Sequence, residues 1–336
     1  MVFTRFTKSQ NPPWPLNETI DQPSIPLVVF YSFKGGVGRS TALASYAIQR
    51  SRMGEKIVVL DLDFDAPGVG QLISVDTKGT VAQWGVVDYL LEVEISNPEL
   101  KDYYHVCRNQ KIVGDGEIIV FPSGKIDDYY PKKIARIDLD LPLLKNEIHP
   151  IIKLLNHIIR DLQPNCIIID ARSGLSEMAG FLLSGIAHAY VIFGTTSEQS
   201  WAGIKLVLNR LGKEMILNDR PQKECFIVQA MVPQDKRAQE YAKTKFLETS
   251  YDAFTDHYYF DTSEEELDEN YWYMSDIENE GAPHVPICLS YLPQFAHFDN
   301  LEEIANDLAT LPEYQSLMNR IYSRLNIDVI DNEPTS

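Results

Sequence analysis

A glycine-rich stretch at residues 30–47, FYSFKGGVGRSTALASYA, has the residue types of a phosphate-binding loop. Glycines allow a tight turn whose backbone N–H groups point inward at a phosphate, and a following helix adds the positive end of its dipole. The usual pattern is Gly, four free positions, Gly, Lys and then Ser or Thr. This stretch departs from it twice, because Phe33 stands at the first glycine and Arg39 at the lysine. A lysine occurs earlier in the loop instead, at Lys34.

Two further segments carry carboxylates that could act beside this loop. DLDFDAPG places Asp61, Asp63 and Asp65 at alternate positions after an apolar run, and CIIID ends at Asp170. Carboxylates at strand ends, together with the Ser40 hydroxyl, are oxygen ligands of the kind that Mg²⁺ prefers. Asp65 is more simply interpreted as a residue that caps or solvates its own loop.

The elements that would position these residues alternate between strands and helices. Apolar runs rich in β-branched residues predict strands, and longer segments with helical spacing predict helices. The expected strands are 26–32, 56–62, 117–124, 165–174, 189–197, 225–232 and 284–295, and the expected helices are 40–53, 81–93, 143–162, 175–187, 201–217 and 301–325. This alternation predicts an α/β fold, a mostly parallel doubly wound sheet with helices on both faces. Ligands of such sheets bind beyond the carboxyl ends of the strands, where the loop and both acidic segments are expected.

Charge and composition narrow the classes of partner. The 336 residues carry a net charge of −18 at pH 7, which disfavours contact with nucleic-acid phosphates or a lipid surface. The densest basic cluster we identify is short, at residues 132–136, so we expect neither nucleic acid nor a membrane as partner. The four cysteines lack zinc-ligand spacing, and no apolar run approaches the length of a membrane span. We therefore expect a cytoplasmic protein.

The organisation that we expect is a single domain with two irregular ends. Residues 1–25 read as a proline-rich irregular leader, 26–325 as the domain and 326–336 as an acidic tail. Within the domain, 251–283 contains eleven Asp or Glu, eight aromatic residues and no Lys or Arg, and we interpret it as an insertion. Charge alone predicts a solvated irregular loop there. The aromatic residues instead favour a face on which a partner docks, formed by Tyr258, Tyr259, Phe260, Tyr271, Trp272 and Tyr273.

The loop and the two acidic segments together resemble the MinD/ParA group of P-loop ATPases, which carry a deviant Walker A motif. That motif is KGGxGK followed by Ser or Thr, and the KGGVGRST of this chain is similar to the KGGVGR-motif variant. The resemblance covers about residues 26–325 and implies a P-loop ATPase fold of the same doubly wound class. It implies ATP and Mg²⁺ as cofactors and an ATP-dependent homodimer.

The resemblance also implies a role for each residue of the motifs. Lys34 would reach across the dimer to the phosphates of the other subunit, and Asp63 would position the attacking water. Arg39 would stand in for the loop lysine, and a base-facing amide would fall on Gln229. The implied residues are Lys34 and Asp63 for catalysis; Lys34, Gly35, Gly36, Val37, Gly38, Arg39, Ser40, Thr41 and Gln229 for nucleotide; and Ser40, Asp61 and Asp170 for metal.

The activity implied is a slow or partner-stimulated ATPase that switches a protein partner or effector, as in bacterial conflict systems, with residues 251–283 as the docking segment. Two alternatives stay open. One is a positioning or partition ATPase that associates with DNA or a membrane. The other is a scaffold that binds nucleotide without hydrolysing it, because the guanidinium of Arg39 is planar and bulkier than an ammonium.

Overall fold

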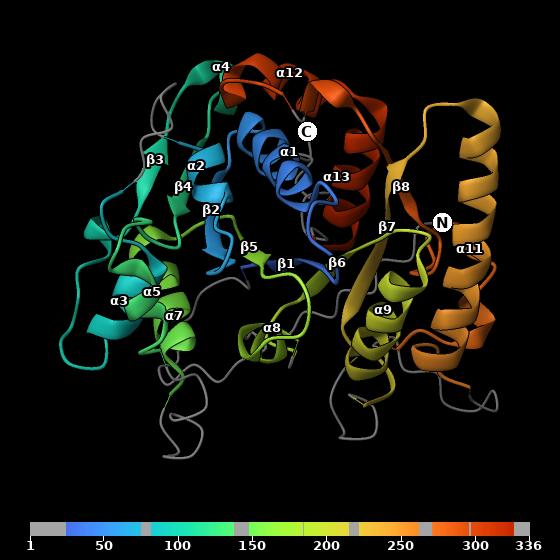
Figure 1. Cartoon of the computed structure of the whole chain (residues 1–336), viewed down its shortest axis with the longest axis horizontal. Helices are drawn as coiled ribbons and strands as arrows, with labels where there is room; N and C mark the ends of the chain where they lie inside the picture. Colours follow the sequence, from blue (N-terminus) through green and yellow to red (C-terminus); the bar gives the residue numbers. More distant parts are fainter. Residues whose placement is uncertain are drawn as a thin grey trace, which may run out of the picture.

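A single eight-stranded sheet organises the protein, in the order β3-β4-β2-β5-β1-β6-β7-β8 (Figure 1). The structure is a computed structural model, and it describes residues 25–74, 82–137, 148–183, 185–214, 222–261, 271–295 and 297–325. The strands are β1 (Leu27–Ser32), β2 (Lys56–Leu62), β3 (His105–Cys107), β4 (Glu117–Phe121), β5 (Cys166–Ala171), β6 (Ala189–Gly194), β7 (Glu224–Val232) and β8 (Ile287–Ser290). All neighbouring pairs are parallel except β3 with β4, which is antiparallel.

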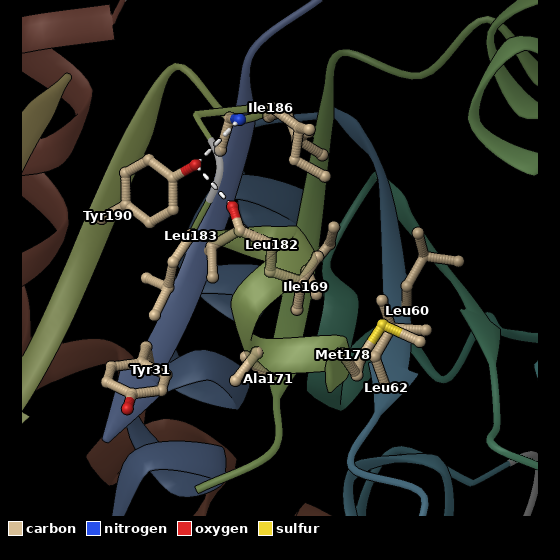
Figure 2. Packing of buried hydrophobic residues seen from close by; sticks show 14 of the residues in the cluster. Tyr31, Leu60, Leu62, Ile169, Ala171, Met178, Leu182, Leu183, Ile186 and Tyr190 are labelled. Carbon is tan, nitrogen blue, oxygen red and sulfur yellow. Dashed lines mark hydrogen bonds between the residues drawn. The ribbon is translucent and has the colours of Figure 1, made fainter. Parts of the chain in front are cut away.

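The central strands are buried on both faces, which is why they read as continuous apolar runs. Alternate residues of β1 point to opposite sides: Leu27, Val29 and Tyr31 join one hydrophobic cluster, whereas Val28 and Phe30 join the other. Figure 2 shows part of the first cluster, where the Tyr190 hydroxyl donates to the Leu182 carbonyl and accepts from the Ala187 N–H. The sheet therefore divides two separate cores.

Helices cover both faces of the sheet, as the sequence predicts. One face carries α1 (Arg39–Arg52), α2 (Val69–Leu72), α4 (Gln110–Val113), α12 (Leu301–Thr310) and α13 (Pro312–Leu325). The other carries α3 (Val86–Glu92), α5 (Tyr130–Ile134), α7 (Pro150–Leu162), α8 (Glu177–Leu182), α9 (Glu198–Leu211) and α11 (Lys236–His257). The predicted fold class, a mostly parallel doubly wound α/β sheet, is confirmed.

The helix α11 was not predicted. It is the longest helix described, with 22 residues, yet its first ten residues contain no buried side chain, and its buried residues begin at Phe246: Phe246, Ser250, Ala253 and Phe254. Its first half therefore shows no apolar periodicity from which a helix could be recognised. Figure 1 places it at one end of the molecule, next to α9.

The expectation that six aromatic residues of 251–283 form a docking face is wrong for four of them, and the other two, Phe260 and Tyr271, are half-buried. Tyr258, Tyr259, Trp272 and Tyr273 are at most 5% exposed, and the first three belong to the core cluster. Their polar atoms are also engaged; for example, the indole Nε1 of Trp272 donates to Glu224 at 3.0 Å. Residues 251–257 are the end of α11, so the first part of the segment continues a helix.

Some expectations lie outside the described residues. These are the leader 1–24, residues 143–147 of the predicted helix 143–162, residues 215–217 of the predicted helix 201–217, the acidic stretch 262–270 and the tail 326–336. Among the described residues, no helix is both long enough and apolar enough to cross a membrane.

Candidate functional site

The glycine-rich loop joins β1 to α1 at the carboxyl edge of the sheet. Gly36 and Gly38 have φ values of 71° and 77°, in the left-handed region that favours glycine. None of the backbone N–H groups of residues 34–41 donates a hydrogen bond to another described residue. Free N–H groups in such a turn, at the start of a helix, form a binding site for an anion. The loop therefore presents Gly35, Val37 and their neighbours as backbone donors.

Phe33, which replaces the first glycine of the usual pattern, anchors the start of the loop on α9. Its ring lies against Gly203, where an added Cβ would come within 2.1 Å of a ring carbon. Gly203 is thus required by a contact between segments that are far apart in sequence. No local pattern around either residue indicates this pair.

The two acidic strand ends meet as expected, because β2 and β5 are neighbours and Asp61 is in register with Asp170. Asp61 is buried, and its carboxylate accepts hydrogen bonds from the N–H groups of Asp63, Gly68 and Gly70. Burial and the nearby charge of Asp170 raise the pKa of Asp61 to about 7. Asp61 therefore fixes the loop that follows β2.

Arg39 joins the carboxylates at the centre of the site. Its Nε donates to Asp170 at 2.5 Å, its Nη2 to Asp63 at 2.9 Å and its Nη1 to the Ser32 hydroxyl at 3.2 Å. Burial alone would lower the pKa of Arg39, but the charges of Asp170 and Asp63 outweigh it and raise that pKa, so the guanidinium remains protonated. Ser32 was not among the predicted residues, although its position at the end of β1, directly before the loop, is a signal that could have indicated it.

Ser40 and Asp170, two of the predicted metal ligands, are also brought together. The Ser40 hydroxyl donates to Asp170 Oδ2 at 2.7 Å. The described residues contain no group of three or more His, Cys, Asp or Glu side chains arranged for a metal ion. Mg²⁺ at phosphate sites commonly takes only one or two protein oxygens and completes its shell with water and phosphate. The residues present fit an Mg²⁺ ion that arrives with a nucleotide, and do not fit a metal site made by protein alone.

Lys34 differs from Arg39 because its charged group is not paired with a carboxylate. It is half-buried, and its ammonium makes no hydrogen bond or ion pair with the described residues. Thr41 is also half-buried, in the first turn of α1. The two cations of the loop therefore have different environments, one paired with carboxylates and one unpaired.

Gln229 lies apart from these residues, on β7. It is 1% exposed, its Nε2 donates to the Ala242 carbonyl at 2.9 Å, and its Oε1 accepts from Cys288 at 3.4 Å. A contact with a nucleotide base stays a prediction for this residue, and it would have to compete with these bonds.

Solved structures with the same fold are found among ParA and MinD proteins. The pNOB8 ParA bound to nonspecific DNA has 13% sequence identity and a TM-score of 0.57, over 90% of this chain and 99% of that one. MinD from Pyrococcus horikoshii, complexed with Mg-ADP, has 14% identity and a TM-score of 0.52, over 88% of this chain and 94% of that one. The MinC:MinD complex of Aquifex aeolicus has 14% identity and a TM-score of 0.51, over 93% and 98%.

At the level of sequence, no protein-family model matches the chain and no curated protein matches it. At these identities the likeness concerns the fold, and it extends over nearly the whole length of each neighbour. A doubly wound sheet, a glycine-rich loop at its carboxyl edge and two acidic strand ends beside that loop accompany the likeness. The chain therefore has the fold of the ParA/MinD P-loop ATPases.

Proposed function

We propose that this protein is a cytoplasmic ATP-dependent switch: it binds ATP with Mg²⁺, closes into a homodimer and thereby changes its affinity for a protein partner. The observation that carries the proposal is the loop at residues 34–41, whose backbone N–H groups have no acceptor among the described residues. A tightly bound phosphate chain would satisfy these donors. The free ammonium of Lys34 lies in the same loop and suits a phosphate of a second subunit.

The same site supports hydrolysis. We assign Asp63 to position the attacking water, and Ser40 with Asp170 to hold Mg²⁺, with Asp61 beside Asp170. The ion would supply charge stabilisation at the phosphates. Asp63 is well suited to hold a water in a fixed place, because its two oxygens are already oriented by Arg39 and by the Ala66 N–H.

The neighbours support the partner and the cofactor. One MinD neighbour is complexed with Mg-ADP, and another is part of a MinC:MinD complex. An interface that depends on nucleotide makes a two-state element that a partner can recognise. The support for placing that partner in a bacterial conflict system is the KGGVGRST motif alone.

Sedimentation velocity with and without ATP and Mg²⁺ tests the switch. We expect monomers without nucleotide and dimers with ATP, because the free donors of residues 34–41 and Lys34 gain acceptors only when ATP is bound. Phosphate release should accompany dimer formation. A protein that remains monomeric in both conditions would refute the switch, and one that dimerises without releasing phosphate, even in a single turnover, would support the scaffold instead.

A second candidate function, association with DNA, is favoured by the first half of α11. The expectation that nucleic acid is not a partner rests on residues 132–136 as the densest basic cluster, but a larger basic group lies on this helix. Four basic side chains are exposed within ten of its residues: Lys236, Arg237, Lys243 and Lys245. The Gln229 side chain donates to the Ala242 carbonyl, and Gln229 is paired with Gly194, the last residue of β6. The turns of α11 that precede Ala242 therefore extend past the end of β6, beyond the carboxyl edge of the sheet. A ParA neighbour is bound to nonspecific DNA.

Charge reversal of Lys243 and Lys245 to glutamate tests this second candidate. If the helix contacts DNA, we expect weaker retention on DNA-cellulose and a salt dependence whose slope falls by about two, roughly one for each lysine that no longer meets a phosphate. The control is reversal of Lys101 and Lys125, which are also exposed but lie on other segments. Equal loss of retention in both double variants would show a general effect of net charge, and no retention of the wild-type protein would remove the candidate.

A further inference from the structure

We propose that Arg39 is a positioning residue of the hydrolytic step rather than a ligand of the phosphates. It holds Asp63 and Asp170 in fixed places relative to each other, while the loop N–H groups and Lys34 meet the nucleotide. The inference rests on the proposed function, because it assigns different roles in that same site to Arg39 and Lys34.

The guanidinium of Arg39 is held at three strand ends at once. Its hydrogen bonds reach Asp170 on β5, Asp63 directly after β2, and Ser32 at the end of β1. The side chain is 8% exposed. A planar fork donates in several fixed directions, whereas an ammonium is a single point charge, so lysine could not bridge the same three acceptors from this position.

Charge favours leaving Arg39 where it is. Asp63 and Asp170 are both buried, and Asp61 adds a third buried carboxyl beside them. If the guanidinium turned away to a phosphate, the buried carboxylate of Asp63 would lose its cation, whereas Asp170 would keep the Ser40 hydroxyl as a partner. If Arg39 remains in place, its ion pairs are kept, and Lys34, which has no partner among the described residues, can supply the positive charge to the phosphates.

The consequence for catalysis is a carboxylate with a fixed orientation. One oxygen of Asp63 accepts from Arg39 and the other accepts from the Ala66 N–H at 3.3 Å. Without Arg39, Asp63 keeps only the bond from a loop backbone and can rotate. A water held by a rotating carboxylate is aligned less often, so the loss falls on the rate of hydrolysis and not on the binding of ATP.

The test compares Arg39→Gln and Arg39→Lys with Lys34→Ala in the full-length chain. We expect kcat to fall about tenfold or more in both Arg39 variants, with KM and the Kd of a fluorescent ATP analogue changed less than about twofold. Guanidinium ion at a millimolar, non-denaturing concentration should restore part of the kcat of Arg39→Gln and none of that of Lys34→Ala. Without nucleotide, Arg39→Gln should melt at a lower temperature than the wild type, because two buried carboxylates lose their cation. Arg39→Lys should melt between the two, because its ammonium can still pair with one carboxylate.

Arg108→Gln is the matched control, since Arg108 is an exposed arginine paired with Glu117 at the other edge of the sheet. It should leave kcat, KM and the response to guanidinium unchanged. A KM that rises in the Arg39 variants at constant kcat, or a kcat that guanidinium does not restore, overturns the positioning role. If the wild type binds no ATP analogue, the proposed function itself fails. This result can be told apart from failure of the positioning role, because it is obtained with the wild type alone.

Discussion

Replacing Lys34 by alanine is expected to weaken the ATP-driven dimer strongly and to lower the rate of hydrolysis by a factor on the order of 10³, the scale of a cation supplied by a second subunit to a phosphoryl transfer. The reason is that its ammonium has no partner among the described residues of its own chain, so its charge is available to a phosphate. For the same reason the melting temperature without nucleotide should match that of the wild type. Sedimentation with ATP and a phosphate-release assay measure the two effects.

Mixing two inactive variants separates action across the dimer from action within one chain. In a mixed dimer of Lys34→Ala and Asp63→Asn, the first chain keeps its own Asp63 and receives Lys34 from the second, so one site of the two is complete. Random pairing makes half of the dimers mixed, and the mixture should recover about a quarter of the wild-type rate at saturating protein. If Lys34 acts within its own chain, no dimer contains a complete site and no activity returns.

The second large effect concerns stability. Gly85→Ala is expected to destabilise the protein by about 3 kcal/mol, as overpacking against rigid backbone does. An added Cβ would lie 2.2 Å from the Pro122 carbonyl oxygen and 2.6 Å from the Gly124 nitrogen. These atoms belong to the turn after β4, to which α3 is attached through the bond from the Val86 N–H to Pro122 at 2.8 Å. Neither the backbone at Gly85 nor the turn after β4 can move away without breaking the hydrogen bond between Val86 and Pro122.

Urea unfolding measures the change, and Gly180→Ala provides the control. Gly180 lies inside α8, and an added Cβ there meets nothing within 4 Å. This substitution should be neutral or stabilising by up to about 1 kcal/mol, because alanine favours a helix interior. Equal stabilities of the two variants would show that the turn after β4 adapts to the added methyl group.

The strands that carry the site could be predicted because their burial on both faces leaves a direct mark on the sequence. The range predicted for β2, 56–62, is the range observed, and the loop, Asp61 and Asp170 gather at one edge as expected. The alternation of strands and helices predicts the edge of the sheet on which a residue lies. It does not predict which side chains at that edge form hydrogen bonds or ion pairs with each other.

The parts that were missed depend on contacts between distant segments or on weak local patterns. Arg39 can bridge its acceptors only because three strands end at matching positions along the sheet edge, which the sequence does not specify. Gly85 and Gly203 are required only because a segment distant in sequence packs closely against each of them. The first half of α11 has no buried face and so no period. Both interpretations of residues 251–283, a solvated loop and a docking face, place the aromatic side chains at the surface, whereas Tyr258 and Trp272 are core residues.

The contact of Phe33 with Gly203 has a consequence for regulation. Along α9, Trp201 packs on Phe246 of α11 with ring centroids 4.8 Å apart, so α9 contacts both the glycine-rich loop and α11. Thermodynamic linkage makes any coupling through these contacts reciprocal. If a macromolecule that binds α11 displaced α9 and so altered the affinity of the proposed nucleotide site, nucleotide would change the affinity for that macromolecule by the same factor. The aromatic residue that replaces the first glycine of the loop would then be the point at which the two binding equilibria meet.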